Sequence, residues 1–297
     1  MAIVLKPFTG KPQYISRSRK WAPRLVLVFG ALALLSIICS MFFGRLLGAK
    51  LGVMLNQWPF LFVPSSILVI FWANNARKDA FGRAGEEEVA RILDSLPNDC
   101  VVLHSIVMPF DQGTFEIDHL VLTPQRGYVV ETKAFVGSLR GTVTDRRWTK
   151  TKLSNRWNLY AMSVGNPIKQ NNFHIVKLRE WIRSQPAESS AAKARKYWWE
   201  NVVVLTGDVV LSDDLAKAKE ICRTYNLAPR LVTGEHRGGP SRIEAEGLGK
   251  DILATAQKYE GKHRPKTSFF RLNFATPDRR STNTARLYMN KARKRRF

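Results

Sequence analysis

One stretch of the chain, residues 115–133, constrains the fold most, because it predicts a β-hairpin that carries charges on one face. Two runs rich in β-branched residues flank a Thr-Pro-Gln-Arg-Gly turn. This pattern is typical of a hairpin with a four-residue loop. If Leu122 pairs with Gly127, continuing the register places Asp118 directly opposite Glu131, and directly opposed residues share a face of the sheet. The hairpin therefore predicts two converging carboxylates.

Lys133 also points to this face, because it follows Glu131 by two residues along an extended strand. Two carboxylates and a lysine on one sheet face are costly to bury unless a further cation joins them. Carboxylate oxygens are hard ligands that favour Mg²⁺ or Mn²⁺ over Zn²⁺. The hairpin is thus a candidate metal site, and the alternative is a solvated sheet face with a cross-strand ion pair.

The charge of the chain points to a polyanionic partner. Its 47 Lys and Arg residues against 24 Asp and Glu give a net charge of +23, which favours either nucleic acid or an anionic membrane surface. The three cysteines, Cys39, Cys100 and Cys222, are far apart and form no CxxC pair. They support neither a zinc site nor a disulfide framework, and we expect a reduced, cytosolic setting for the main domain.

The first part of the chain predicts a membrane anchor. Residues 1–24 are basic and contain no acid, and residues 25–43 form an apolar run of 19 residues free of charge. At 1.5 Å per residue this run is about 28 Å long, enough to cross a bilayer core. A second apolar segment, residues 52–73, contains Pro59 and Pro64, which predict a kink. Residues 25–73 are therefore expected to form a transmembrane hairpin, with a buried helical pair as the alternative.

The positive-inside rule orients this hairpin, because both of its outer flanks are more basic than the connector at residues 44–57. We expect a two-pass protein of the bacterial inner (cytoplasmic) membrane whose soluble domain faces the cytoplasm. At the other end, residues 261–297 form a basic tail, expected to be disordered. The tail could follow a nucleic acid backbone or lie on anionic lipid, and both readings stay open.

Between anchor and tail, residues 78–260 predict one α/β domain with a mixed sheet flanked by helices. The expected elements, in chain order, are a helix opening at Gly85 and ending before Pro97, a strand at 101–108, the hairpin, a strand at 137–143, a helix at 166–183 capped by Asn166, a polar linker at 184–196, an interior strand at 202–207, a short strand at 230–233 and a closing helix at 241–259.

Residues 82–210 resemble the nuclease-related domain (NERD), a branch of the PD-(D/E)xK nuclease superfamily. The resemblance rests on motifs that occur in the family's order: Gly85-Glu86, Ile117-Asp118-His119, Glu131-Thr132-Lys133, the Gly137 and Trp148 region, Asn166-Pro167-Ile168-Lys169-Gln170, and the strand at 202–205. It implies a PD-(D/E)xK-like mixed sheet.

The resemblance also implies roles for five residues. Asp118 and Glu131 would coordinate Mg²⁺ or Mn²⁺, and Lys133 would orient or activate the attacking water and stabilise the developing charge. Glu86 would lie at the edge of the site and hold a metal-bound water or a second metal ion. Gln170 would reach in from the second helix, towards the phosphate or the lysine.

Three further polar residues lie close to these in the sequence. Glu116 precedes Asp118 by two residues and shares its strand face, so it could be an extra ligand or a solvated residue at the sheet edge, and we favour the edge. His119 points away from Asp118 and is expected to be a structural histidine with satisfied ring nitrogens. His174, one helical turn after Gln170, could line the groove but is not predicted to be a site residue.

Together these features predict a membrane-anchored, metal-dependent nuclease that hydrolyses phosphodiester bonds, in DNA rather than RNA by the habit of the superfamily. The chemistry agrees, because a bound divalent cation neutralises charge on the phosphate and lowers the pKa of an attacking water. A non-catalytic protein is the alternative: a nucleic-acid-binding or scaffold component of a membrane assembly for DNA transfer or defence. The oligomeric state does not follow from the sequence.

Overall fold

The computed structural model describes residues 1–9, 27–28, 30–31, 67, 79–111, 113–153, 159–233 and 239–260. The chain divides into two compact units, one made of residues 1–13 and 83–297 and the other of residues 14–82. Apart from five isolated residues, the predicted transmembrane segments lie outside the described part, and so does the basic tail. Among the helices of the described part, none is long and apolar enough to cross a membrane.

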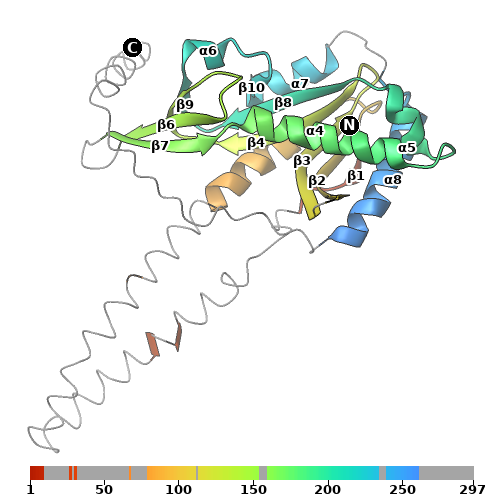
Figure 1. Ribbon diagram of the computed structural model, residues 1–297, viewed down its shortest axis with the longest axis horizontal. Coiled ribbons are helices and arrows are strands. Elements are labelled where there is room, and N and C mark those ends of the chain that lie inside the picture. The colour runs from red at the N-terminus through yellow and green to blue at the C-terminus, as the bar shows by residue number, and fades with distance from the viewer. Residues whose placement is uncertain are drawn as a thin grey trace, which may run out of the picture. The chain divides into compact units, whose positions relative to one another are not determined.

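The main layer of the first unit is a six-stranded mixed sheet (Figure 1). Its strands, in spatial order, are β1 (Ile3–Lys6), β2 (Val101–Phe110), β3 (Gly113–Leu122), β4 (Gly127–Ala134), β8 (Trp199–Thr206) and β10 (Ile221–Arg223). The three central strands pair antiparallel, whereas β1, β8 and β10 pair parallel with their neighbours. The predicted mixed sheet is confirmed.

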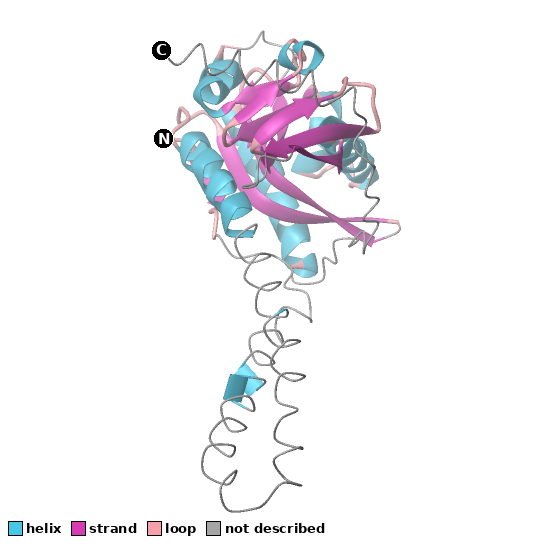
Figure 2. Ribbon diagram, turned by 90° about the vertical axis from the view of Figure 1, so that its left-hand side faces the viewer, coloured by secondary structure: helices cyan, strands magenta, loops and turns pink. Residues whose placement is uncertain are grey.

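A second sheet has four strands, in the order β7 (Leu159–Gly165), β6 (Arg147–Leu153), β5 (Gly137–Arg140) and β9 (Val209–Leu211). Figure 2, in which all strands are magenta, shows the strands in the middle of the domain with helices beside them. Trp148 is the central side chain of the second sheet, 1% exposed, and packs in a cluster with Leu139 and Val203. The cluster joins the two sheets, because Val203 belongs to the main one.

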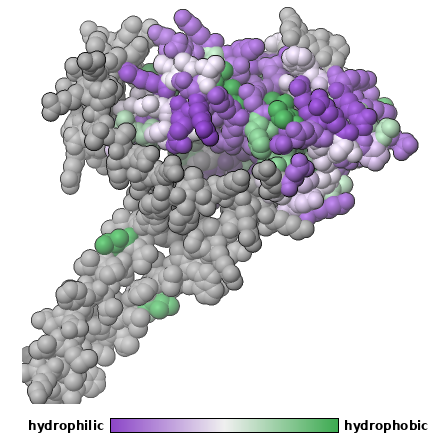
Figure 3. All heavy atoms as spheres, viewed as in Figure 1, coloured by the Kyte–Doolittle hydropathy of each residue, from purple (hydrophilic) through white to green (hydrophobic). Residues whose placement is uncertain are grey.

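Helices cover both faces of the main sheet (Figure 1). On one face, α4 (Pro167–Ser184) and α8 (Arg242–Tyr259) pack against β2, β3 and β4. On the other, a helix of residues 79–94 and α7 (Thr224–Val232) cover residues of β2, β4 and β8. Three short helices, α5 (Ser190–Lys193), the 3-10 helix Ala194–Lys196 and α6 (Asp213–Ala216), complete the domain. The side of the domain seen in Figure 3 is mainly hydrophilic, with a small hydrophobic patch over α4.

Two helices begin as the sequence predicts. The Asn166 side chain caps α4 by accepting a hydrogen bond from the Ile168 N–H at 2.8 Å, and Pro167 occupies the first helical position. Helix α8 begins with a capping box in which Ser241 and Glu244 bond each other's backbone N–H groups. These local signals fix the two helices that lie on the same face of the sheet.

The structure differs from the sequence prediction at several places. Strands β6, β7, β9 and β10 and helix α6 were not predicted, and the helix predicted to open at Gly85 already includes residues 79–84. Residues 230–233, predicted as a strand, belong largely to α7, because Leu227 and Leu231 are spaced as one helical face and are both fully buried. The predicted linker at 184–196 contains α5 and the 3-10 helix. Strand β1 was not predicted, because four residues inside a basic flank give no pattern of their own.

Asn171 fixes α4 to the sheet. This fully buried side chain donates hydrogen bonds to the Val129 carbonyl at 2.7 Å and to the Asn201 side chain at 2.8 Å. We expect Asn171→Leu to lower the free energy of unfolding by about 1–3 kcal/mol, because its partners would lose their donor. Urea unfolding measures the change. The exposed neighbour Lys169, replaced by Ala, should change it by less than about 0.5 kcal/mol.

Candidate functional site

The hairpin has the register that the sequence predicts. Leu122 pairs with Gly127, and the antiparallel pairing runs on to His119 and Val130. At the next position the Asp118 side chain accepts a hydrogen bond from the Thr132 N–H at 2.8 Å. Asp118 is thereby held across the strand pair, beside the residues that flank Thr132 in β4.

Glu131 is the buried centre of the site. Its side chain is 1% exposed, and the Lys133 Nζ lies 2.5 Å from its Oε1. His174, from α4, places its Nδ1 3.6 Å from Oε2 of the same carboxylate. The predicted carboxylate–lysine pair is therefore present, and it is joined by His174, which was not predicted to be a site residue.

Glu86 reaches the site because the helix of residues 79–94 approaches the sheet closely. A Cβ atom on Gly85 would lie 2.3 Å from the Thr206 Oγ1 at the end of β8, so a glycine is needed at this contact. The next residue, Glu86, then interacts electrostatically with Asp118 and Lys133. Its neighbours in the chain, Glu87 and Glu88, are exposed, which separates Glu86 from the ordinary acids of a first helical turn.

Burial and mutual repulsion raise the pKa values of three acidic side chains in this region, Glu86, Glu116 and Asp118. Desolvation, followed by the charge of Asp118, raises the pKa of Glu86 to about 7. The same two causes raise the pKa of Glu116 to about 8. The pKa of Asp118 rises to about 7 through burial and through the Glu131 charge. Four carboxyls thus share one region, and Glu116, expected to be a solvated edge residue, belongs to the group.

Lys133 is the cation among these acids. Burial alone would lower its pKa, but Glu131 and Asp118 outweigh burial and raise the pKa above the ordinary value. The side chain therefore remains an ammonium group at neutral pH. It is suited to stabilising negative charge, whereas a general base would need a lowered pKa.

The strand opposite Asp118 is irregular. Ser105 of β2 has a φ of 48°. Among the non-glycine residues that the structure describes, it is the one with a positive φ. The regular alternation of side chains between the two faces of β3 breaks here. Ile117 and Leu120 are three positions apart, yet both face the same core cluster. A backbone conformation of this kind costs about 1–3 kcal/mol, and such strain gathers at functional sites.

The N-terminal strand adds a lysine to the site. The Lys6 Nζ donates a hydrogen bond to the Ser105 carbonyl at 2.8 Å, and the Lys6 charge acts to lower the pKa of Glu116. No sequence pattern indicates a role for this residue, because a parallel strand pairing across almost a hundred residues has no local signature. His174 did have a signal, since it lies one turn after Gln170 on the same side of α4.

His119 is structural, as predicted. It is fully buried, its Nδ1 lies 2.7 Å from the Nδ1 of His104, and its Nε2 lies 3.2 Å from the Thr132 Oγ1. His104 in turn contacts Asp94 through Nε2 at 2.9 Å. This chain of hydrogen bonds supports Thr132, whose N–H positions Asp118.

The predicted role of Gln170 stays a prediction. Its side chain is exposed at the start of α4, and the contact between this helix and the carboxylates comes from His174. A substrate lying over the start of α4 could still meet Gln170.

The donor set can be compared with what a divalent cation needs. Among the described residues, no group of three or more His, Cys, Asp or Glu side chains has an arrangement that could hold a metal ion by itself. Both Glu131 carboxylate oxygens are nevertheless buried, with Lys133 beside Oε1 and His174 near Oε2, and the Glu131 charge raises the pKa of Asp118, which lies close by. Mg²⁺ is usually held by one or two carboxylates and keeps several waters. Asp118 and Glu131 fit that pattern.

These carboxyls make a pH-dependent contribution to stability. Since folding raises the pKa of Glu116 from 4.5 to about 8, its contribution is full below pH 4.5 and is lost as the pH rises to about 8. With EDTA present, we expect the melting temperature to fall over this interval and Mn²⁺ to restore it at the upper end. Glu116→Gln should flatten the profile, whereas Glu87→Gln, at an exposed position, should leave it unchanged. A parallel fall in both variants would contradict the assignment.

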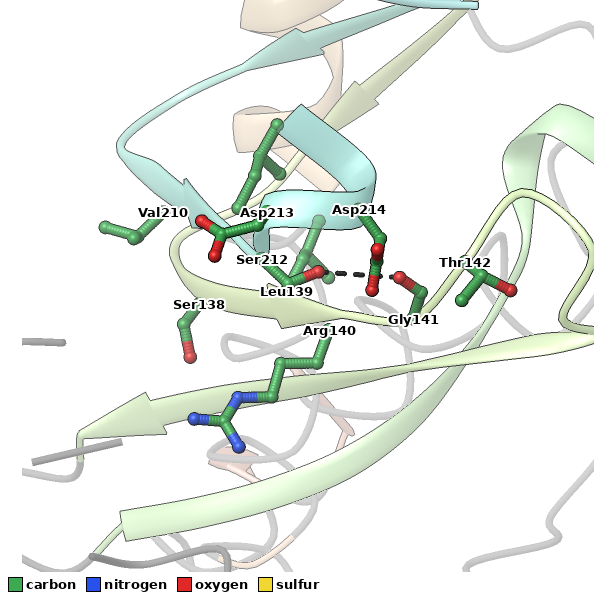
Figure 4. A pocket seen from close by; sticks show the side chains of 10 residues that line it. Ser138, Leu139, Arg140, Gly141, Thr142, Val210, Ser212, Asp213 and Asp214 are labelled. Atoms are coloured by element: carbon green, nitrogen blue, oxygen red, sulfur yellow. Dashed lines mark hydrogen bonds between the residues drawn. The ribbon is translucent and has the colours of Figure 1, made fainter. Parts of the chain in front are cut away.

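A cavity of about 330 Å³ lies apart from these residues, between β5, β9 and the start of α6 (Figure 4). Its lining includes Arg140, Asp213 and Asp214, and the Ser212 hydroxyl donates a hydrogen bond across it to the Gly141 carbonyl at 3.4 Å. None of the predicted site residues lines this cavity. The candidate site is the carboxylate group and not this hollow.

Comparisons with known proteins agree with the motifs. The family model described as the nuclease-related domain matches residues 81–206, a range that contains Glu86, Asp118, Glu131 and Lys133. An uncharacterized protein of Bacillus anthracis is 35% identical over 184 residues, which cover 60% of this chain and 82% of that protein. No solved structure matches the chain. The chain therefore belongs to the nuclease-related domain family.

Proposed function

We propose that this protein is a metal-dependent nuclease that hydrolyses phosphodiester bonds in nucleic acid, with DNA as the favoured substrate. The observation that carries the proposal is the buried Glu131 carboxylate, placed between the Lys133 ammonium and His174, with Asp118 and Glu86 close by. Perturbed pKa values that cluster around one charged pair are typical of functional sites. Membership of the nuclease-related domain family supports the same reading.

Asp118 and Glu131 would hold Mg²⁺ or Mn²⁺, and Glu86 would bind a water at the edge of the site. A divalent cation bound there supplies charge neutralisation and a water of lowered pKa. The Lys133 ammonium would stabilise negative charge on the phosphate as the attacking oxygen approaches. The Thr132 N–H keeps the Asp118 carboxylate turned towards this region.

Degradation of plasmid DNA by the full chain tests the proposal. Cleavage should require Mg²⁺ or Mn²⁺ and should stop when EDTA is added. A matched RNA substrate reports the preference for DNA. Absence of cleavage with both metals on both substrates would contradict the nuclease and favour a binding or scaffold role.

We also propose that residues 25–43 and 52–73 anchor the chain as a two-pass hairpin in the bacterial inner membrane, with the nuclease domain in the cytoplasm. The support is the charge-free run of 19 residues and the basic flanks on both sides. A topology reporter fused after Phe297 should behave as cytoplasmic. An external signal would contradict the orientation, and recovery of the chain in the soluble fraction would contradict the anchor.

A further inference from the structure

The surface beside the carboxylates carries an aromatic cluster that the proposed chemistry does not use. Phe110, Phe115 and Phe173 contact one another edge to face, with ring centroids 5.7–6.3 Å apart. Phe115 is buried, but Phe173 is 42% exposed. Figure 3 shows a small hydrophobic patch over α4 among hydrophilic side chains. An exposed ring supported from behind by two others is a rigid flat platform.

The platform is continuous with the candidate site. The His174 ring stacks on Phe115, with centroids 5.6 Å apart and an interplanar angle of 25°. The same histidine lies 3.6 Å from the Glu131 carboxylate. The Phe173 ring centroid lies 6.1 Å from that of His174, so a group resting on the platform would lie beside the histidine that approaches Glu131.

Cations flank the exposed ring along α4. Lys169, Phe173 and Lys177 follow one another at four-residue spacing, which places them in one row of the helix, about 6 Å apart along its axis. The Lys177 Nζ lies 5.8 Å from the ring centroids of both Phe110 and Phe173 and is also paired with Glu180 at 2.7 Å. The row therefore alternates cation, aromatic ring and cation.

We propose that this platform, made of Phe110, Phe115, Phe173 and Lys177, stacks an unpaired base of single-stranded nucleic acid next to the phosphate to be cleaved. The inference rests on the proposed nuclease function and specifies its substrate class. A single strand presents phosphate, base and phosphate in succession, which complements the row on α4. In a duplex the faces of the bases are covered by their neighbours, so a lateral ring cannot reach them. Stacking on aromatic side chains is tolerant of sequence, because every base has a π-face.

Binding of a short fluorescent oligonucleotide, measured by anisotropy with EDTA present to prevent hydrolysis, tests the platform in the full chain. Phe173→Ala should weaken binding of the single strand by about 5- to 150-fold and leave binding of the matching duplex unchanged. Phe173→Trp should retain the affinity for the single strand. Val176→Ala is the matched control, because Val176 is 50% exposed on the same helix and has no ring; it should bind both substrates like wild type.

Equal weakening for single strand and duplex, or an equal loss in Val176→Ala, would overturn the proposal. Unchanged binding of the single strand by Phe173→Ala would also overturn the proposal. If that variant had instead lost self-association, the patch would be an interface between copies of the chain. The cleavage assay tests the nuclease function independently of this binding assay. A protein that cleaves nothing but loses single-strand affinity in Phe173→Ala keeps the platform and loses the nuclease, whereas metal-dependent cleavage with unchanged Phe173→Ala binding does the reverse.

Discussion

Replacement of Glu131 by Gln should reduce the rate of metal-dependent DNA cleavage by at least about 100- to 1000-fold, the range found when one preorganised oxyanion-hole donor is removed from an active site. The substitution keeps the size of a side chain that is 1% exposed. It removes the negative charge that would hold the cation and that pairs with Lys133. The initial rate of plasmid degradation at fixed Mg²⁺ concentration measures the effect.

The control for this substitution is Glu246→Gln. Glu246 also forms an ion pair, with Arg242, but it lies on the exposed side of α8, and the variant should cleave at the wild-type rate. Thermal melting followed by circular dichroism separates loss of chemistry from loss of fold. A folded Glu131→Gln protein that cleaves like wild type would remove Glu131 from the mechanism.

The second large effect concerns stability. The Glu200 carboxylate of β8 accepts two hydrogen bonds from arginine side chains. One comes from Arg126, in the turn between β3 and β4, at 2.5 Å, and the other from Arg230 of α7 at 2.7 Å. Arg126 is only 7% exposed. Glu200→Ala should lower the free energy of unfolding by about 3–5 kcal/mol, because it leaves buried positive charge without the carboxylate that the two arginines share. Urea unfolding monitored by tryptophan fluorescence measures the loss.

Glu246→Ala provides the comparison. Glu246 pairs with Arg242 at 3.1 Å on the exposed side of α8, and exposed pairs of this kind contribute about 0–1 kcal/mol. A small effect at both glutamates would mean that the Glu200 pair is as well solvated as the surface pair. A large effect at Glu200 alone would show that its ion pairs stabilise the packing of the hairpin turn, β8 and α7 against one another.

The central part of the site follows from local sequence. A Thr-Pro-Gln-Arg-Gly turn fixes the register of the β3–β4 hairpin, and a period of two along each strand then brings Asp118 and Glu131 together. Gly85 is similar, because the closeness of its helix to β8 requires a residue without a side chain. Signals of this kind act over a few residues and can be recognised in a single sequence.

Other parts of the site depend on long-range packing. Glu116 was expected to be a solvated edge residue, but packing largely buries its carboxyl in the acidic group, on the strand face that it shares with Asp118. Gln170 and His174 share one side of α4, so which of them meets Glu131 depends on how the helix crosses the sheet. The helical periodicity of the sequence does not determine the angle at which α4 crosses the sheet.

The pairing of Ile3 with Val101 has a practical consequence for work on this protein. A soluble fragment cut to the boundaries that the motifs suggest, from residue 78 onward, would lack β1. The outer backbone edge of β2 would then have no partner, and unpaired edges of sheets promote aggregation. Such a fragment would also lose the Lys6 bond to the Ser105 carbonyl, directly behind the acidic group. Weak activity or poor solubility of such a fragment would therefore be explained by the loss of β1, and it would not count against the proposed function.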